Sequence, residues 1–256
     1  MKVLEIQGLS FAYGNPRERY RNQVLEGVDL CVESGERVGL IGANGTGKST
    51  LLKLFTGLLE MQEGKLSVAG MEMNKENLKA IRSEIGYVFQ DSDSQLFMST
   101  VYEDVAFAPR NYGKSEEETR SLVMRALEQV HMEGRKDRQI YRLSGGEKKL
   151  VSIATVLAMG SKLMLLDEPS VALDPKNRRN LIHILNELPG AAVIASHDLD
   201  FVYDTCQRAV LLSGGRIAAD GEAKDILTDQ GLLEEHGLEL PLSFSRSYLT
   251  ETGNLG

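Results

Sequence analysis

Apolar and polar residues alternate in several short segments of the N-terminal part of the chain. The alternation covers residues 3–6, 9–11 and 28–32, and residues 66–68 form a shorter example. A period of two residues is typical of strands that bury one face. We therefore expect an N-terminal antiparallel β-subdomain, packed against a more deeply buried parallel core.

A second group of segments is mostly apolar, which is typical of strands buried on both faces of a parallel sheet. Such runs occupy residues 85–89, 163–166, 191–196 and 209–212, and a hairpin turn is expected at 213–215. Helices are expected between the strands. Ser115 and Glu118 have the spacing of a capping box, and Asp174 followed by Pro175 is typical of a capped helix start.

This order of elements predicts one α/β domain over residues 1–256, with a mixed parallel sheet, the antiparallel β-subdomain and an inserted α-helical subdomain. The core is expected at about 1–90 and 143–225, and the helical subdomain at about 91–142. A C-terminal extension should occupy about 226–256.

Composition limits the classes of function. The 256 residues carry a formal net charge of -8, which argues against a nucleic acid bound by a broad basic face. The cysteines, Cys31 and Cys206, have no metal-ligand spacing. We find no signal-peptide pattern and no apolar run near the ~18 residues of a membrane span. We therefore expect a cytoplasmic chain, whose membrane partner would be a separate polypeptide.

Residues 42–49, with the sequence GANGTGKS, fit the G-x-x-x-x-G-K-[ST] pattern of a phosphate-binding loop (P-loop). Its glycines allow close approach of the main chain to phosphate, and the following helix N-terminus favours anions. A glycine turn that merely precedes Lys-Ser would not explain the strand–loop–helix context. The pattern predicts a P-loop NTPase core in which Lys48 contacts the β- and γ-phosphates of ATP and Ser49 ligates Mg²⁺. Within this loop and at the start of the following helix, the other expected ATP contacts are Asn44, Gly45, Gly47 and Thr50.

Asp167 and Glu168 follow directly after the apolar run 163–166. A carboxylate at the end of a buried strand can hold Mg²⁺, and the next carboxylate can polarise the water that attacks the γ-phosphate. Buried carboxylates are costly unless they are paired or bound to metal, which favours a function over a simple strand end. Asp167 is therefore a candidate metal ligand and Glu168 a candidate catalytic base.

Leu143-Ser144-Gly145-Gly146-Glu147 resembles the signature motif of ATP-binding-cassette (ABC) ATPases, and the order of motifs along the whole chain is similar to that of this family. Ser144 and the glycine amides would form a second anion site where a helix starts near Glu147. A capping serine with a glycine pair is the plainer interpretation of the motif alone. The resemblance implies that Ser144, Gly145 and Gly146 contact the ATP of a second subunit, in a head-to-tail homo- or heterodimer.

Four more positions match motifs of the family, and the resemblance alone implies their roles. Tyr13 corresponds to the aromatic residue that stacks on adenine. Gln90 corresponds to the Q-loop glutamine that contacts Mg²⁺ and the attacking water. Asp174 ends the D-loop motif at residues 170–174 and is an expected nucleotide contact, and His197 corresponds to the switch histidine at the γ-phosphate.

The chain departs from the family pattern at Glu147, where glutamine is common, and at residues 148–150, which lack a frequent arginine. A narrower resemblance is to the ATPases of energy-coupling-factor (ECF) transporters, especially cobalt/nickel importers. Residues 88–97, residues 100–107 and the signature motif carry this resemblance. In that group a short extra helix follows the Q-loop, at the place of residues 93–97.

The resemblance implies an ATP- and Mg²⁺-dependent ATPase on the cytoplasmic face of the cell membrane, as a subunit of an ECF-type importer for cobalt/nickel or a vitamin. Its partners would be a transmembrane coupling subunit and a substrate-binding membrane subunit, without nucleic acid. One alternative is the ATPase of another ABC importer class. A soluble ABC protein that remodels DNA or ribosomes is less favoured, because the 256 residues contain neither a long coiled-coil insertion nor a second cassette.

Residues 91–102 are expected to line a groove that receives helices of the membrane partner. Leu96, Phe97 and Met98 are apolar residues in an otherwise polar connection, as a docking surface requires. The alternative is that Leu96 and Phe97 pack the subdomain onto the core. Acidic side chains at positions 91, 93 and 103 should add charge suited to basic groups of a partner.

Overall fold

The computed structural model describes residues 1–14 and 22–244. Strands β1 (Lys2–Tyr13), β2 (Asn22–Glu33), β4 (Glu63–Val68) and β5 (Met71–Glu72) form an antiparallel sheet in the order β2-β1-β4-β5. This confirms the predicted β-subdomain, but the two N-terminal alternating segments belong to one strand, β1. Irregular pairing with β2 between these segments interrupts the alternation, so the sequence pattern divides a continuous strand into two.

A second sheet has the order β10-β9-β3-β8-β7-β6. Strands β3, β6, β7, β8 and β9 are parallel, whereas β10 is an antiparallel edge strand joined to β9 by the predicted hairpin. The mixed parallel sheet is therefore confirmed. Its strands are Arg37–Ile41 (β3), Ile85–Val88 (β6), Leu163–Asp167 (β7), Ala191–Ala195 (β8), Arg208–Ser213 (β9) and Arg216–Glu222 (β10).

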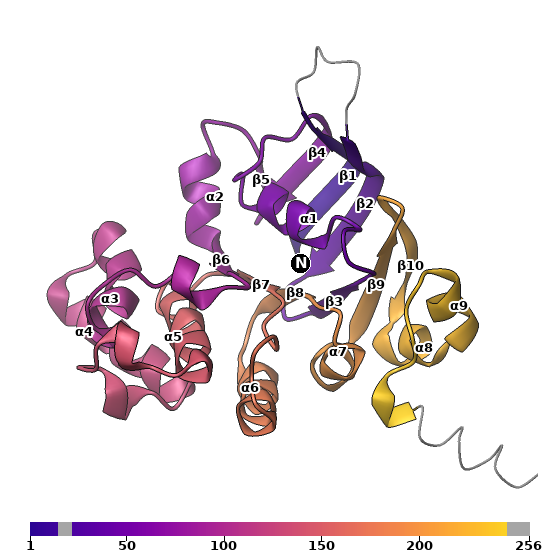
Figure 1. Ribbon diagram of the computed structural model, residues 1–256. Helices are drawn as coiled ribbons and strands as arrows, with labels where there is room; N and C mark the ends of the chain where they lie inside the picture. The colour runs from indigo at the N-terminus through magenta and orange to yellow at the C-terminus, as the bar shows by residue number, and fades with distance from the viewer. Residues whose placement is uncertain (15–21, 245–256) are drawn as a thin grey trace, which may run out of the picture.

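Helix α1 (Lys48–Phe55) lies between the two sheets, as Figure 1 shows. Side chains of the central strands alternate between two hydrophobic clusters. Leu163 and Leu165 of β7 face α1 and the antiparallel sheet, whereas Met164 and Leu166 face the helices on the other side. Because successive residues of a strand point to opposite faces, residue 167 belongs to the face of β7 that is directed toward α1.

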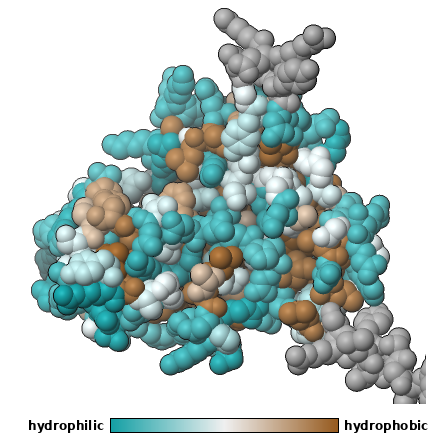
Figure 2. Space-filling view, viewed as in Figure 1, coloured by the Kyte–Doolittle hydropathy of each residue, from teal (hydrophilic) through white to brown (hydrophobic). Residues whose placement is uncertain are grey.

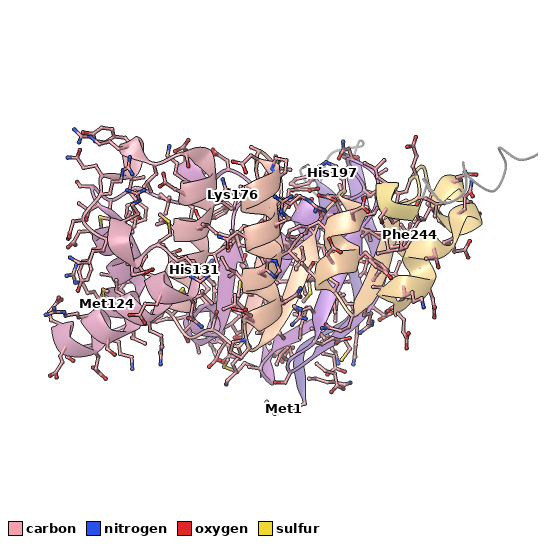
Figure 3. The ribbon with its side chains drawn as sticks, turned by 90° about the horizontal axis from the view of Figure 1, so that it is seen from below. Met1, Met124, His131, Lys176, His197 and Phe244 are labelled. Atoms are coloured by element: carbon pink, nitrogen blue, oxygen red, sulfur yellow. The ribbon has the colours of Figure 1, made fainter. Side chains whose placement is uncertain are left out.

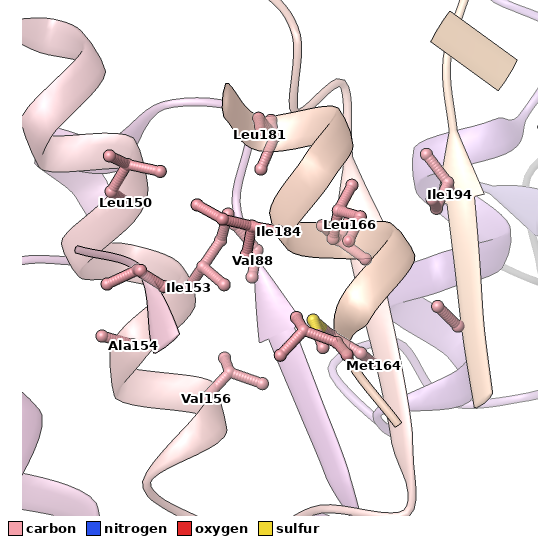
Figure 4. Close-up of a cluster of buried hydrophobic side chains, with 14 of the residues drawn as sticks. Val88, Leu150, Ile153, Ala154, Val156, Met164, Leu166, Leu181, Ile184 and Ile194 are labelled. Carbon is pink, nitrogen blue, oxygen red and sulfur yellow. The ribbon is translucent and has the colours of Figure 1, made fainter. Parts of the chain in front are cut away.

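The opposite face of the parallel sheet is covered by α5 (Gly145–Leu157), α6 (Pro175–Glu187), α7 (Leu199–Thr205) and α8 (Ala223–Thr228), with α9 (Gln230–Glu235) beside α8. Figure 4 shows Leu150 and Ile153 of α5 near Ile184 of α6, with Val88 of β6 between the two helices. This packing joins the signature helix α5 to the core.

The helical subdomain consists of α3 (Val101–Asn111) and α4 (Glu116–Gln129), which pack against α5. The predicted capping box begins α4, because the Ser115 hydroxyl accepts from the Glu118 amide (3.2 Å) and the Glu118 carboxylate accepts from the Ser115 amide (2.9 Å). Helix α2 (Leu78–Glu84) precedes β6. Short 3₁₀ turns occupy Ser92–Ser94, Glu133–Arg135 and Ile140–Arg142.

The expected short helix after Gln90 is therefore a single 3₁₀ turn, at Ser92–Ser94. Within the described residues, none of the helices has the length and apolar character needed to cross a bilayer. The expected C-terminal extension includes α9 and a segment that follows it to residue 244. Its remaining residues, 245–256, lie outside the part that the structure describes.

Candidate active site

The P-loop connects β3 to α1 and requires glycine at two of its positions. Gly42 has φ 151° and Gly47, which caps α1, has φ 106°. A Cβ atom at residue 42 would lie 2.3 Å from the carbonyl oxygen of Leu212. Side chains are excluded there, so the main chain turns tightly and directs the first amides of α1 to a common site. Such a loop is suited to binding the phosphates of a nucleotide.

Lys48 lies at the first position of α1, and its ammonium group is held inside the loop. Its Nζ atom donates to the carbonyl oxygens of Gly42 (2.7 Å) and Ala43 (3.2 Å). Burial lowers the pKa of Lys48, and the charges of Glu168 and Asp167 act in the opposite direction. A positive group is thereby directed toward the position expected for phosphate.

Ser49 and Asp167, the predicted metal ligands, are in direct contact. The Ser49 hydroxyl donates to Oδ1 of Asp167 at 2.9 Å, and Asp167 is only 5% exposed. A hydroxyl and a carboxylate oxygen beside a phosphate site are the hard oxygen donors that Mg²⁺ prefers, so these residues fit the ion. The structure adds a residue that the sequence analysis missed: the Tyr87 phenol donates to Oδ2 of Asp167 at 3.0 Å.

Glu168 and His197 come from the ends of adjacent strands, β7 and β8, and contact each other. Oε2 of Glu168 lies 2.8 Å from Nδ1 of His197 and also accepts from the His197 main-chain amide (3.3 Å) and the Ser196 hydroxyl (3.4 Å). In Figure 3, His197 lies at the edge of the molecule that also contains Lys176, opposite Met1. The predicted base and the predicted switch histidine therefore form one hydrogen-bonded unit.

A cavity of about 490 Å³ connects these groups. Its wall contains P-loop residues, the predicted base, the switch histidine and, from the Q-loop, the exposed Gln90. A cationic side chain, metal-suited oxygens and a carboxylate in one cavity are the components needed to bind a nucleoside triphosphate and hydrolyse it. The lining residues are Asn44, Gly45, Lys48, Ser49, Gln90, Glu168, Val171, Ala172 and His197.

A larger cavity, of about 810 Å³, lies between α7 and the C-terminal segment, and His197 borders it as well. Four carboxylates line it, from Asp198, Asp200, Asp204 and Glu239, and Arg178 in its wall is paired with Asp198 at 2.9 Å. This acidic lining would repel a polyphosphate. The smaller cavity is therefore the candidate nucleotide site.

Tyr13 lies at the end of β1, is 41% exposed, and has its hydroxyl 3.2 Å from the Thr50 hydroxyl. The ring also packs edge to face against Phe11, with 4.9 Å between centroids. An exposed aromatic ring that contacts the P-loop helix could stack on a base. The structure thus connects two of the predicted nucleotide contacts, Tyr13 and Thr50.

The signature residues are not part of the cavity wall. Helix α5, expected to start near Glu147, begins at Gly145. Ser144 is its cap: the Ser144 amide donates to Glu147 (2.9 Å), and the Glu147 amide donates to the Ser144 hydroxyl (3.3 Å). Ser144 and Gly145 are exposed, whereas Gly146 is buried against Asn177 of α6.

Asp174, the remaining predicted contact, caps α6 through bonds from the amide and side chain of Asn177, both 2.8 Å. The structure shows this capping role, and nucleotide contact by Asp174 stays a prediction. Lys149 was also missed by the sequence analysis. The residue is 3% exposed, and its ammonium donates to the carbonyl oxygens of Phe89 (2.9 Å) and Gln90 (2.7 Å), so it connects α5 to the Q-loop.

Long-range contacts of Tyr87 and Lys149 had only weak signals in the sequence. Tyr87 carries a hydroxyl within the strand segment 85–89, and Lys149 directly precedes the apolar residues Leu150 and Val151 of α5. A polar group within an apolar segment indicates that a buried partner is needed. The sequence does not identify that partner.

Comparison with known proteins agrees with this geometry. The family model described as ABC transporter matches residues 25–171, more than half of the chain. A putative ABC transporter ATP-binding protein of Gloeobacter violaceus is 48% identical over 87% of this chain and 92% of its own length. An energy-coupling factor transporter ATP-binding protein of Carboxydothermus hydrogenoformans is 39% identical over 94% of this chain and 88% of its own.

Among solved structures, the fold is similar to that of cbiO1 from Clostridium perfringens, part of the ABC transporter complex cbiONQ. The TM-score is 0.82 at 32% identity, and the match covers 98% of this chain and 99% of that one. The similarity extends over the β-subdomain, the parallel sheet and the helical insertion alike.

Proposed function

Since this chain belongs to the family of ABC transporter ATP-binding proteins, ATPases coupled to transport, we propose that its particular role is to energise an ECF-type importer. The observation that most directly supports ATP hydrolysis at a site shared by two subunits is the cavity at the P-loop, which contains the proposed hydrolytic residues but not the signature residues. A second subunit would supply Ser144, Gly145 and Gly146, so the active form is a homo- or heterodimer.

Each predicted residue has a defined task in this proposal. Lys48 and the P-loop amides hold the phosphates of ATP, and Tyr13 stacks on adenine. Ser49, Asp167 and Gln90 would hold Mg²⁺, which neutralises phosphate charge when bound. Glu168 accepts a proton from the attacking water, and His197 contacts the γ-phosphate while its bond to Glu168 orients the carboxylate.

The ECF assignment rests on the resemblance of residues 88–107 and on the similarity to ECF and cbiO proteins. In this role the protein binds the cytoplasmic face of the cell membrane, together with a transmembrane coupling subunit and a substrate-binding membrane subunit. The cargo is cobalt/nickel or a vitamin, and it is recognised by the substrate-binding membrane subunit.

The proposed docking surface for the coupling subunit is formed by Phe97 and Phe107. Leu96 is buried, whereas Phe97 is 64% and Phe107 41% exposed, and their rings meet edge to face with 4.9 Å between centroids. Figure 2 shows hydrophobic residues at the surface of the helical subdomain, amid a mainly hydrophilic face. An exposed aromatic pair is suited to contact an apolar segment of a partner.

The acidic residues expected to help docking also have partners within the chain, and their role in docking stays a prediction. Asp91 accepts bonds from the Ser94 hydroxyl and the Asp93 amide. Asp93 itself pairs with Lys148, and Glu103 pairs with Arg110. Docking should therefore depend on the aromatic pair more than on acidic charge.

Recovery of the protein with its partners from detergent-solubilised membranes tests this function. The tagged wild type should be recovered with two kinds of integral membrane protein, and Phe97→Asp should lose them while still binding ATP. Leu242→Asp is the matched control, because Leu242 is 74% exposed but lies in the C-terminal segment. Recovery with ribosomes or DNA, or with a permease that uses a soluble binding protein, would contradict the ECF assignment.

A further inference from the structure

We propose that Tyr87 is a positioning residue that orients the Asp167 carboxylate toward Mg²⁺. This inference rests on the proposed function, because it assumes that Asp167 belongs to a metal–nucleotide site. The two oxygens of Asp167 have separate donors: Ser49 of α1 donates to Oδ1 (2.9 Å) and Tyr87 of β6 donates to Oδ2 (3.0 Å). With both oxygens held, rotation of the carboxylate is restricted.

The register of the parallel sheet explains this contact. Strand β6 pairs with β7 so that Tyr87 lies beside Leu165, two residues before Asp167. Tyr87 and Leu165 belong to the cluster on the α1 side of the sheet. Alternation places Asp167 on the same face. The length of a tyrosine side chain then carries its hydroxyl to the end of the neighbouring strand.

The chemistry of the two donors suits a metal site. Both are neutral hydroxyl groups, so they fix the carboxylate without cancelling the negative charge that attracts a divalent cation. Burial, together with the Asp167 charge, raises the pKa of Tyr87, which therefore keeps the proton that it donates. A lysine or arginine at this position would compete with the cation for the carboxylate.

The Tyr87 ring is itself held in place by the Q-loop. Phe89 packs against it with 4.6 Å between centroids, and the Phe89 amide donates to Gln95 (3.0 Å). The Gln95 side chain in turn donates to the Ser152 carbonyl (2.9 Å) and the Thr155 hydroxyl (3.0 Å) of α5. The donor of Asp167 is thus part of a rigid assembly, as effective outer-shell groups require.

Removal of one hydroxyl group, in Tyr87→Phe, tests the inference. Mn²⁺ can replace Mg²⁺ as the probe, and its affinity for the protein–ADP complex is measured by electron paramagnetic resonance. We expect Mn²⁺ to bind about 10-fold more weakly, as is common when an outer-shell donor is lost. The affinity for ADP in the presence of EDTA should stay unchanged, because the P-loop contacts remain.

Two further variants make the result specific. Tyr102→Phe removes a hydroxyl from another partly buried tyrosine, in α3, and should leave Mn²⁺ binding unchanged. In an Asp167→Asn background, Tyr87→Phe should have no additional effect on Mn²⁺ affinity, because the residue acts through Asp167.

Several outcomes would overturn the assignment. These are unchanged Mn²⁺ affinity in Tyr87→Phe, an equal loss of ADP affinity in EDTA, or an additive effect in the Asp167→Asn background. A wild-type protein that binds neither ADP nor Mn²⁺–ADP would overturn the proposed function as well. A wild type that binds both, with no change in the variant, would overturn only the role of Tyr87.

Discussion

Glu168 has an unusual main-chain conformation, with φ 47°. This left-handed region is strained for a residue with a long side chain. Bonds to the next strand maintain it: the Glu168 amide donates to the Ala195 carbonyl (2.8 Å), and its carboxylate contacts Ser196 and His197. This conformation places the Glu168 carboxylate at the end of β7, directly after Asp167, where it borders the nucleotide cavity.

Glu168→Gln should retain ATP binding but lose turnover. The amide preserves the size of the side chain but cannot accept a proton from water, so we expect kcat to fall roughly 100-fold or more. Steady-state hydrolysis and equilibrium binding of ATP measure the two properties, and an ATP-bound dimer should accumulate. Glu187→Gln, at the exposed end of α6, is the control. Near-normal hydrolysis by Glu168→Gln would contradict the role of Glu168.

Lys149 should make stability depend on pH. Burial lowers its pKa from 10.5 to about 8 in the folded protein. Between these values the unfolded chain binds more protons at this position, so the folded state gains stability as pH rises, and below about pH 8 the burial cost is complete. Lys149→Met lacks this titration.

Thermal unfolding of both proteins at about pH 7 and about pH 9.5 checks the sign. The Tm of wild type minus that of Lys149→Met should be more positive at the higher pH. If this Tm difference stays constant or becomes more negative at the higher pH, burial does not lower the pKa of the Lys149 ammonium in the folded protein. Lys148→Met, which removes the neighbouring pair with Asp93, should show no comparable change.

At the scale of elements, the sequence predicts correctly those helix starts that depend only on residues close together in the chain. The Ser115–Glu118 capping box and the Asp174 cap of α6 involve residues three positions apart, and both form as expected. The helix expected to start near Glu147 begins at Gly145. A Cβ at Gly146 would lie 2.6 Å from the Asn177 side chain, so the close packing of α5 on α6 requires glycine there, a contact from a distant part of the chain that local signals do not reveal.

The same distinction applies to the candidate site. P-loop, acidic strand end and signature are contiguous motifs, so the sequence identifies them; the structure brings Lys48, Ser49 and Glu168 to one cavity, whereas the signature lies outside it. Tyr87 and Lys149 act on residues that neighbouring elements supply. Their contacts depend on strand order and helix packing, which residue spacing alone does not determine.

Helix α3 holds the loop that contains Phe97, through Asp104. This carboxylate is buried and accepts from the amides of Phe97 (3.2 Å) and Met98 (3.0 Å), and burial raises its pKa. Asp104→Asn replaces one acceptor oxygen by a donor, so we expect a loss of about 1–2 kcal/mol in unfolding free energy. Amides 97 and 98 should exchange hydrogen faster.

Recovery of membrane partners by Asp104→Asn should also decrease, because the aromatic pair is no longer fixed. Glu103→Gln is the matched control: the neighbouring side chain is 45% exposed, and its pair with Arg110 lies near the surface, where such pairs contribute about 0–1 kcal/mol. Unchanged exchange at amides 97 and 98 would contradict the role of Asp104 in holding this loop.

At the scale of the whole molecule, the two predicted anion sites belong to different layers. The P-loop lies between the sheets, whereas the signature caps α5 beside the helical subdomain (Figure 1). Ser144 and Gly145 are exposed, and the nucleotide cavity lacks them. In a two-fold dimer each signature can face the other subunit's P-loop, so two equivalent sites form.

Mixing two inactive variants tests this arrangement. Ser144→Arg has an intact P-loop and a damaged signature, whereas Lys48→Ala has the opposite combination. The loss of the Ser144 cap costs about 1 kcal/mol, so the variant should still fold. A mixed dimer has one site with both defects and one with neither. With equal mixing and independent sites, about a quarter of wild-type hydrolysis should return.

If mixed dimers demonstrably form and hydrolysis does not return, the two sites are not shared between subunits in this way, or one intact site does not suffice. An ATP-dependent crosslink between cysteines placed at residue 144 and in the opposing P-loop distinguishes the two, because only the second explanation is compatible with its formation.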